Sequence, residues 1–435
     1  MRSLTCSIAL LAMGAFATGA AAQNPSPAHT ETVKRIMDSA AYKKAVDTVD
    51  KEHERWIDEV IKLTEIEAPP FKEETRAKVY ADMFKAHGLT DVEIDPEGNV
   101  LGVRKGTGGG PLVVVSAHLD TVFPAGTDVK VKRQGTRLYA PGVGDDSTGL
   151  ATLLQYVRAL DAAGAKTKSD IVFMGTVGEE GLGDLRGVRY FFTKGKYKDQ
   201  VKAFFSLDGG GVTDVTTGGV GSKRYRVTFK GPGGHSFGAF GIVNPMAALS
   251  QAVVELYKLQ VPARPKTTYS ASVTGGGTSV NSIPNEAWME FDMRSEDAGE
   301  LDKVEKRFLT ILNQAVETEN YARSTKEGAV TVDAKLVGDR PAGQTDRNSD
   351  IVQFATAAYM AQGIKPEYRT SSTDSNMPMS LKIQALTMPR ADKGGRNHSL
   401  DEWVDTEKEG NHKVKQIGLA TILAMAGLDG VSVGQ

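Results

Sequence analysis

The stretch Leu-Val-Val-Val-Ser-Ala-His-Leu-Asp at residues 112–120 places an apolar run directly before a histidine and an aspartate. Two more apolar runs, at residues 171–176 and 201–207, also end next to glycine and acidic residues. Ligands of an open α/β sheet bind at the carboxyl ends of its strands. We therefore expect three strands of one sheet whose acidic loops meet at the same edge.

Helical patterns surround these strands. Residues 30–90 have mostly helical periodicity, and another helix is expected at residues 150–160, between the first two runs. Strands that alternate with helices are typical of a parallel or mixed sheet. The predicted fold class is therefore α/β, with a mixed sheet flanked by helices.

The pattern changes near Gly218. The elements expected from there are a strand, a helix, two strands, a helix and a strand, at residues 224–230, 244–259, 268–274, 286–293, 301–319 and 329–337. This βαββαβ order is typical of a ferredoxin-like α+β unit. Because the alternation of helices and strands resumes after Asp350, we interpret the unit as an insertion. The predicted domains are a catalytic domain at residues 23–217 and 341–435, and an inserted domain at residues 218–340.

The N-terminal residues predict export. Met1-Arg2 is followed by an apolar stretch at residues 8–17 and by small residues up to Ala22, as in a secretory signal at residues 1–22. The apolar stretch is shorter than a membrane helix requires. We expect a secreted or periplasmic mature chain without a membrane anchor. Because the single cysteine, Cys6, lies in this signal, nitrogen and oxygen must hold any metal in the mature protein.

The net charge of the chain bears on whether its partner is a nucleic acid. The net charge is -2 and the pI is about 6.4, so there is no basic stripe to neutralise phosphates. This argues against nucleic acid as a partner. The mature chain of roughly 410 residues is longer than one hydrophobic core usually spans, which again favours two or more domains.

Five short motifs carry the candidate chemistry. They are His118-Leu119-Asp120, Asp145-Asp146, Glu179-Glu180, Asp208 and His398. A carboxylate two residues after a ligating histidine can accept the other ring N–H, as Asp120 would from His118. A single histidine at a strand end is usually structural, but five motifs of this kind together favour a metal site.

Each acidic motif also has a simpler interpretation. Asp145 and Asp146 follow a glycine-rich turn, where one carboxylate could bridge two cations or cap the helix expected near Thr148. Glu179 and Glu180 could form a solvated surface pair. Directly after a buried strand, however, one of them could bind metal while the other acts as general base on a water.

Charge balance suits a pair of divalent cations. Asp145, Glu180 and Asp208 carry three negative charges, and Asp208 follows so apolar a strand that it needs a partner. Two cations carry four positive charges, and a hydroxide completes the balance. Nitrogen and oxygen ligands without thiolate suit two Zn²⁺, with Co²⁺ or Mn²⁺ as alternatives.

These motifs, in this order, resemble the M20 family of dinuclear zinc exopeptidases and deacylases over essentially the whole mature chain. The ligand sets that the resemblance implies are His118, Asp145 and Asp208 for one zinc, and Asp145, Glu180 and His398 for the other. It also implies that Asp120 orients His118 and that Glu179 is the general base. A cis peptide between Asp145 and Asp146 is a further implication.

The resemblance makes the inserted domain a lid that also forms a homodimer. His235 matches a lid histidine that stabilises the oxyanion, often from the partner subunit. Asn281 and Arg294 match lid residues that bind a substrate carboxylate, a task for which an arginine fork is suited. For Arg294, an ordinary ion pair with Glu290 or Asp292 is the alternative.

Two features depart from the family pattern. Many members carry lysine soon after the bridging aspartate, where this chain has Ser147. The resemblance also assigns no role to the basic residues that precede His398, such as Arg390 and Lys393.

The leading hypothesis is an exported, zinc-dependent exopeptidase that hydrolyses amide bonds of short peptides. An N-acyl amino acid amidohydrolase is the first alternative, because it requires the same attack on an amide carbonyl. A non-catalytic metal- or peptide-binding protein is the second. The presence of Glu179 beside Glu180 argues against it, because a binding protein needs the metal ligand but not the base.

Overall fold

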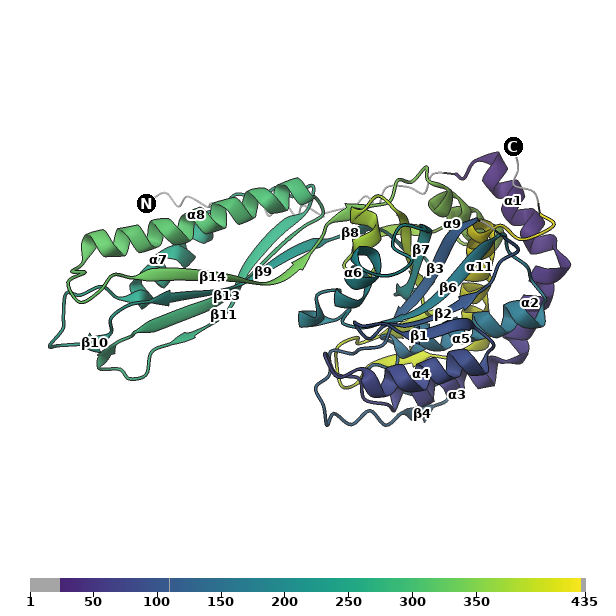
Figure 1. The fold of residues 1–435 in the computed structure, drawn as a ribbon, viewed down its shortest axis with the longest axis horizontal. Coiled ribbons are helices and arrows are strands. Elements are labelled where there is room, and N and C mark those ends of the chain that lie inside the picture. Colours follow the sequence, from purple (N-terminus) through teal and green to yellow (C-terminus); the bar gives the residue numbers. More distant parts are fainter. Residues whose placement is uncertain (1–23, 109, 432–435) are drawn as a thin grey trace, which may run out of the picture.

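The computed structural model describes residues 24–108 and 110–431, so the predicted signal at residues 1–22 lies outside the described part. Figure 1 shows a larger α/β body beside an elongated second body that carries its own sheet. In the described residues, no helix combines the length and the apolar character needed to cross a bilayer.

A nine-stranded mixed sheet forms the centre of the larger body. Its middle strands lie in the order β6 (Ser169–Thr176), β3 (Gly110–His118), β7 (Val201–Gly209) and β17 (Gln384–Pro389), and all three neighbouring pairs are parallel. The outer strands are β1 (Thr90–Ile94), β2 (Val100–Arg104), β8 (Asp214–Gly219), β15 (Gly343–Gln344) and β16 (Glu367–Ser371). The three predicted strands are thus adjacent, and their carboxyl ends meet at one edge.

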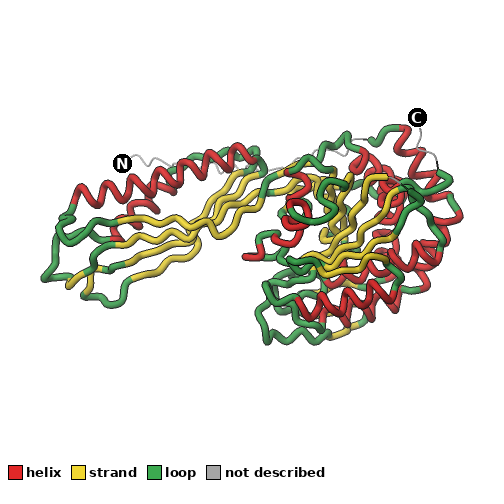
Figure 2. The backbone as a smooth tube through the Cα atoms, in the orientation of Figure 1, coloured by secondary structure: helices red, strands yellow, loops and turns green. Residues whose placement is uncertain are grey.

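Helices cover both faces of this sheet (Figure 2). Val113 and Val115 of β3 pack in one apolar core and Val114 packs in the other, as the alternation of side chains along a strand requires. The first core includes α1 (Pro27–Asp38), α2 (Ala40–Lys51), α3 (His53–Thr64), α4 (Glu74–Ala86), α5 (Ser147–Ala162), α9 (Asp350–Ala361) and α11 (Lys408–Ala426). The second includes α6 (Arg186–Thr193) and α10 (Asn376–Ser380).

A small antiparallel sheet lies beside the loops that carry the predicted ligands Asp145 and His398, here called the metal-ligand loops. Its strands are β18 (Lys393–Gly395), β19 (Trp403–Asp405), β5 (Arg137–Tyr139) and β4 (Lys132–Gln134), in that spatial order. The sheet therefore brings the segment before Asp145 next to the segment that contains His398.

The second body, here called the lid, is ferredoxin-like, as predicted. Its sheet has the antiparallel order β11 (Thr267–Gly276), β13 (Glu286–Ser295), β9 (Gly221–Lys230) and β14 (Thr331–Arg340). The helices α7 (Pro245–Leu256) and α8 (Ala298–Ala322) pack on one face, against Phe291 and its alternating neighbours on β13. Asn244 caps α7 by accepting the N–H of Met246 at 2.9 Å.

Candidate metal centre and substrate pocket

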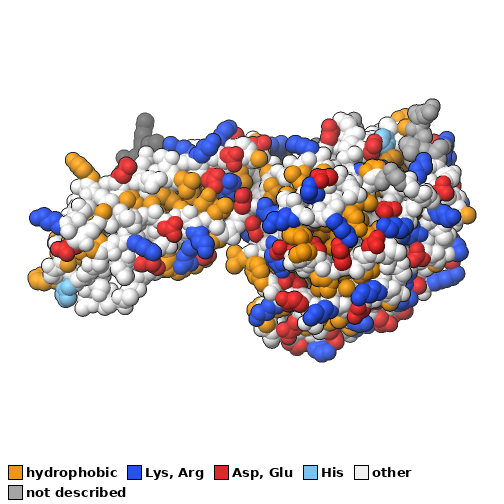
Figure 3. All heavy atoms as spheres, in the orientation of Figure 1, with side chains coloured by type: hydrophobic (Ala, Val, Ile, Leu, Met, Phe, Trp, Pro, Cys, Tyr) orange, Lys and Arg blue, Asp and Glu red, His pale blue; other side chains and the backbone are white. Residues whose placement is uncertain are grey.

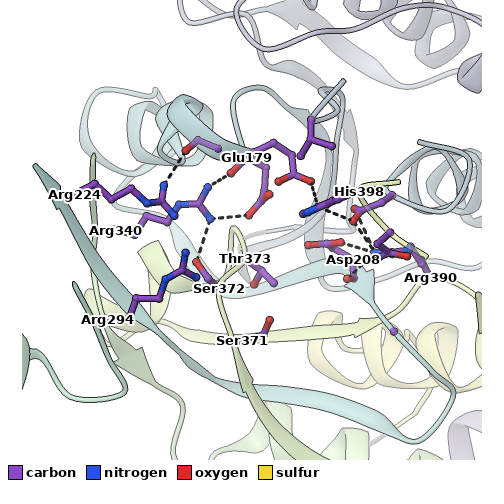
Figure 4. A pocket seen from close by; sticks show the side chains of 16 residues that line it. Glu179, Asp208, Arg224, Arg294, Arg340, Ser371, Ser372, Thr373, Arg390 and His398 are labelled. Carbon is purple, nitrogen blue, oxygen red and sulfur yellow. Dashed lines mark hydrogen bonds and ion pairs between the residues drawn. The ribbon is translucent and has the colours of Figure 1, made fainter. Parts of the chain in front are cut away.

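Four strand ends deliver the charged side chains of the site, and Figure 4 shows Glu179, Asp208 and Arg390 from three of them. His118 is the last residue of β3, and Asp208 lies at the end of β7. Glu179 and Glu180 follow β6, and Arg390 follows β17 directly. Because these strands are parallel neighbours, residues that are far apart in the sequence become adjacent at the sheet edge.

The two aspartates of the glycine-rich turn have different roles. Asp146 caps α5: its carboxylate accepts the N–H of Gly149 at 3.2 Å and the N–H of His118 at 3.1 Å. Asp145 instead lines the pocket, and the peptide bond between the two is cis, as the resemblance implied. Beneath the turn, Glu402 accepts the N–H groups of Gly144 and Asp145. Asp146 therefore has the predicted capping role, and Asp145 is left as the candidate bridging carboxylate.

Asp145 faces two histidines with its two oxygens. Oδ1 lies 3.0 Å from Nε2 of His118, and Oδ2 lies 3.5 Å from Nε2 of His398. Asp208 Oδ1 lies 3.8 Å from His118, and Glu180 Oε1 lies 2.8 Å from His398. The two sets of three share Asp145, which is the arrangement of a bridging carboxylate.

This donor set fits a pair of divalent cations. Zn²⁺ binds nitrogen and oxygen at about 2.0–2.2 Å in a tetrahedron, so its ligand atoms lie about 3.3 Å apart. The four separations between the two histidines and these carboxylates, 2.8–3.8 Å, bracket that value. Asp146 also lies within ligand reach of His118 and Asp208, but its oxygens already accept two backbone N–H groups. Asp145 is therefore the better ligand.

Neighbouring opposite charges stabilise the ionised forms of His398 and Asp145. Hydrogen bonds to Asp145 and Glu180 raise the pKa of His398 to about 10. Burial opposes ionisation of Asp145, but Arg390 and the two histidines hold the pKa of that carboxyl well below its usual value. A carboxylate that stays ionised when buried is suited to bind cations.

Asp120 contacts His118 differently from what was predicted. Its backbone carbonyl oxygen lies 3.0 Å from Nδ1 of His118, whereas the nearest carboxylate oxygen lies 3.7 Å away. The carboxylate instead accepts the N–H groups of Glu179 and Glu180 at 3.0 and 2.8 Å. An ionised acceptor forms stronger bonds with such donors. Asp120 thus holds the acidic pair in place with its side chain and the histidine with its main chain.

Glu179 lies in the pocket opposite an arginine that the sequence did not indicate. Arg340, the last residue of lid strand β14, donates to Glu179 Oε1 at 3.3 Å and to the Glu179 carbonyl oxygen. Burial raises the pKa of Glu179 well above its usual value, and Arg340 only partly offsets this. A raised pKa is the property expected of a carboxylate that accepts and releases a proton near neutral pH.

A cavity of about 550 Å³ opens beside these acids, between the larger body and the near end of the lid. Its lining includes the metal-ligand candidates Asp145, Glu180, Asp208 and His398. Figure 4 shows that Arg224, Arg294 and Arg340 lie on the opposite side of this pocket from His398. The cavity thus has a cation-binding side and a second, arginine-rich side.

Arg294 lines the pocket and also forms an ion pair within the lid. Its Nε donates to Asp292 Oδ2 at 2.8 Å, so the predicted ion pair is present. Asp292 also accepts from Arg224 at 3.1 Å. The Asp292 carboxylate therefore pairs with two guanidinium groups, those of Arg224 and Arg294. This wall of the pocket consequently has a net positive charge.

His235 and Asn281 lie apart from the metal-ligand loops within one chain. His235 is in β10 (Gly234–His235), which pairs with β12 (Ser282–Ile283) directly after Asn281. Figure 1 places β10 at the far end of the lid, and neither residue lines the 550 Å³ cavity. Figure 3 shows a histidine side chain exposed at that end. The structure therefore does not place His235 and Asn281 at the pocket of their own chain.

Two arginines of the site were not among the predicted site residues: Arg390, to which the sequence assigned no role, and Arg340. Arg390 Nη1 donates to Asp208 Oδ1 at 2.6 Å and lies 3.4 Å from Asp145 Oδ1. The signal available in the sequence was an arginine at the end of an alternating strand or directly after an apolar one. That signal was too common to single them out.

The family assignment agrees with this site. Residues 114–417 match the sequence model of peptidase family M20/M25/M40, and the chain belongs to that family. A hydrolase from Pyrococcus abyssi is 34% identical over 120 residues, and carboxypeptidase G2 from a Pseudomonas species is 26% identical over 199 residues. These matches span 32% and 47% of those proteins, and 28% and 45% of this chain.

Longer matches extend across both bodies. Succinyl-diaminopimelate desuccinylase from Leptothrix cholodnii is 24% identical over 356 residues, which cover 78% of this chain and 88% of that protein. Aminopeptidase PepT from Bacillus cereus has the same fold, with a TM-score of 0.69 and 20% identity over 86% of this chain and 99% of its own. The dipeptidase Dug1p from Saccharomyces cerevisiae has a TM-score of 0.68 at 17% identity, over 89% of this chain and 100% of its own.

Proposed function

We propose that this protein is a zinc-dependent exopeptidase that hydrolyses amide bonds of short peptides bearing a free carboxylate. The observation that carries the proposal is the position of Asp145, whose two oxygens face His118 and His398 at the edge of a cavity that also contains Glu179. Two Zn²⁺ held by His118, Asp145, Glu180, Asp208 and His398 would polarise the scissile carbonyl and lower the pKa of the attacking water.

Glu179 performs the proton transfers in this proposal. It lines the same cavity as the ligand candidates but lies against Arg340, so its carboxylate is not needed to hold a cation. It takes the proton of the attacking water and delivers it to the nitrogen of the leaving group. The carboxylate of Asp120 fixes the backbone of Glu179 during these steps.

The arginine-rich side of the cavity selects the substrate. Arg294 is 46% exposed, so its outer N–H groups can reach a ligand, whereas Arg340 is nearly buried against Glu179. A guanidinium group binds a carboxylate through two parallel hydrogen bonds. A peptide whose free carboxylate lies at Arg294 would have its terminal amide bond near the metal-ligand loops.

An N-acyl amino acid amidohydrolase is the second candidate. The relative with the most extensive match reported above is named a desuccinylase, and a succinyl group carries a carboxylate that the same arginines could bind. A succinylated amine would present the recognised carboxylate on the acyl side of the amide bond, whereas a peptide presents it on the amine side.

A homodimer would complete the site. Nδ1 of His235 accepts the N–H groups of Phe237 and Gly238, so in the neutral ring Nε2 carries the proton and is a donor suited to an oxyanion. Around it, Phe237, Phe240 and Val280 are 89%, 81% and 102% exposed. Large apolar side chains grouped at the tip of a domain favour contact with a second copy. We propose that the lid tip of one subunit reaches the pocket of its partner.

The first experiment is mass spectrometry of the products from mixed substrates. Free di- and tripeptides, C-terminally amidated copies and N-acetylated or N-succinylated amino acids are incubated with Zn²⁺-loaded protein. Cleavage confined to peptides with a free C-terminus supports the exopeptidase. Release of succinate or acetate alone would transfer the assignment to the amidohydrolase. Activity that persists after chelation and dialysis contradicts both.

Export is a separate proposal, supported by the sequence of residues 1–22. Cell fractionation and N-terminal sequencing of the mature protein test it. A mature chain that begins near Gln23 outside the cytoplasm is the expected result, whereas an intact Met1 in the cytoplasm contradicts it.

A further inference from the structure

The fold places a buried arginine directly at the candidate metal centre. Arg390 follows the last residue of β17, and its N–H donates to the carbonyl oxygen of Gly209 on the neighbouring strand β7. This pairing puts the start of its side chain beside Asp208, and only 6% of the residue is exposed. The position is therefore determined by the sheet and not by a flexible loop.

The guanidinium group of Arg390 approaches only one half of the metal centre. Its Nη1 donates to Asp208 Oδ1 at 2.6 Å and to the Asp208 carbonyl oxygen at 2.9 Å, and it lies 3.4 Å from Asp145 Oδ1. The same two carboxylate oxygens are the ones nearest to Nε2 of His118. The two carboxylate oxygens beside His118 thus already accept hydrogen bonds from a positively charged side chain of the protein.

The other half has a different environment. Asp145 Oδ2 accepts from the neutral amide of Asn397 at 3.1 Å and faces His398, which also lies beside Glu180. None of the hydrogen bonds or ion pairs found for these two carboxylate oxygens in the described residues involves an arginine. The two halves of the centre therefore differ by one positive charge.

Arg390 changes the charge balance predicted from the sequence. Asp145, Glu180 and Asp208 carry three negative charges, and an arginine side chain remains protonated in proteins. One divalent cation together with Arg390 already supplies three positive charges. A second divalent cation would add two more within a few ångströms of the guanidinium group, where like charges repel.

We propose that Arg390 makes the two cation sites unequal. The site formed by His398, Glu180 and Asp145 fills first, and the site formed by His118, Asp145 and Asp208 binds its cation more weakly. Arg390 is a positioning residue here, because it acts on the carboxylates and not on the substrate. This inference rests on the proposed metal-dependent function and adds the order in which the metals bind.

Metal titration of the full chain tests the proposal without relying on activity. Chelator-treated protein is dialysed against increasing concentrations of Co²⁺, and bound cobalt is measured by mass spectrometry and by its visible absorption. Wild type is expected to bind one Co²⁺ tightly and a second one about ten-fold or more weakly. Arg390→Met should bind two Co²⁺ with closer affinities, because the competing charge is absent.

Ligand variants assign the phases of the titration. His398→Ala should abolish the tight binding of the first Co²⁺, and His118→Ala should abolish the weaker binding of the second. Arg158→Met is the matched control, because Arg158 is also a buried arginine with two glutamate partners, Glu52 and Glu59, but it lies outside the pocket. Its cobalt titration should equal that of wild type.

Three outcomes decide against the inference in distinguishable ways. Two Co²⁺ bound with equal affinity by wild type would overturn it, and this result needs no variant. A folded Arg390→Met, or Arg390→Gln if the methionine variant does not fold, whose second affinity equals that of wild type would also overturn it. Absence of any bound Co²⁺ in wild type would instead overturn the proposed function, and the inference with it.

Discussion

The carboxylate of Asp120 accepts the backbone N–H of Glu180 at 2.8 Å, and its other oxygen accepts the N–H of Glu179 at 3.0 Å. One side chain that is fully buried therefore fixes both the proposed base and a proposed metal ligand. The bond to Glu180 joins the loop after β3 to the loop after β6. Neither loop alone would hold the acidic pair at the pocket.

Replacing Asp120 should weaken metal binding and catalysis together. In Asp120→Ala both N–H groups lose their acceptor, and the loss of such a supporting partner typically costs about 10- to 100-fold in metal affinity or activity. Asp120→Asn keeps one carbonyl oxygen and should have an intermediate effect. Metal affinity by equilibrium dialysis and kcat on a dipeptide substrate measure the change. Normal values in Asp120→Ala would contradict this supporting role.

Glu179→Gln should separate catalysis from metal binding. We expect kcat to fall by about two to four orders of magnitude, because the amide cannot accept the proton of the attacking water. Metal content should stay at the wild-type value, since Glu179 contacts Arg340 and not the histidines. Glu180→Gln, by comparison, should lose metal. A Glu179→Gln variant that loses metal to the same extent would make Glu179 a ligand.

Arg294→Met should raise KM for peptides with a free C-terminal carboxylate by about ten-fold or more and leave kcat nearly unchanged, because it removes a charge-assisted contact with the substrate. Arg226→Met is the control: Arg226 pairs with Glu290 on the same sheet and does not line the cavity. The KM for amidated peptides is the second readout. An equal rise in KM for free and amidated peptides would exclude the carboxylate as the contact.

Complementation should reveal a shared active site. Glu179→Gln and His235→Ala are each expected to be nearly inactive, whereas a mixture that exchanges subunits should recover activity. Each hybrid dimer would contain one pocket with an intact Glu179 and an intact histidine from the partner. Size-exclusion chromatography establishes exchange. If the hybrid forms and the mixture is no more active than the sum of its parts, His235 does not act across the dimer.

Asp374 should make the stability of the metal-free protein depend on pH. Burial raises the pKa of Asp374 to about 7, and its Oδ1 has no hydrogen-bond partner in the described part of the chain. The folded state thus keeps a proton that the unfolded state releases above about pH 4. The protonated Asp374 carboxyl therefore contributes to the free energy of unfolding, and this contribution is fully present below about pH 4 and is lost as the pH rises to about 7.

Asp374→Asn should remove this dependence and still accept the hydrogen bond of Thr176. Between pH 4 and 7, the free energy of unfolding of the variant should rise relative to wild type by up to ~1.4 kcal/mol per pH unit, and above pH 7 the difference should level off. Urea unfolding in the presence of chelator measures it. Parallel stability curves would show that Asp374 is ionised in the folded state.

Local sequence patterns predicted a large part of this protein. The apolar run before His118 predicted a buried strand, and β3 forms there. The strand and helix order after Gly218 predicted the ferredoxin-like lid. Such predictions succeed because the periodicity of a strand or helix is set by neighbouring residues, and because the carboxyl ends of parallel strands must share an edge. The motifs at those ends therefore had to come close to one another.

The tertiary structure decided which side chains meet. Arg340 and Glu179 are separated by 161 positions, and Arg390 and Asp208 by 182. A long guanidinium side chain fits many local contexts, so only the assembled sheet and lid determine which carboxylate it reaches. The same holds for the division of roles between Asp145 and Asp146, which depends on where α5 begins, because Asp146 is its N-cap. The sequence by itself thus determined the strands and the chemistry at their ends, whereas packing decided the partners, because those contacts join segments that have no local relation to each other.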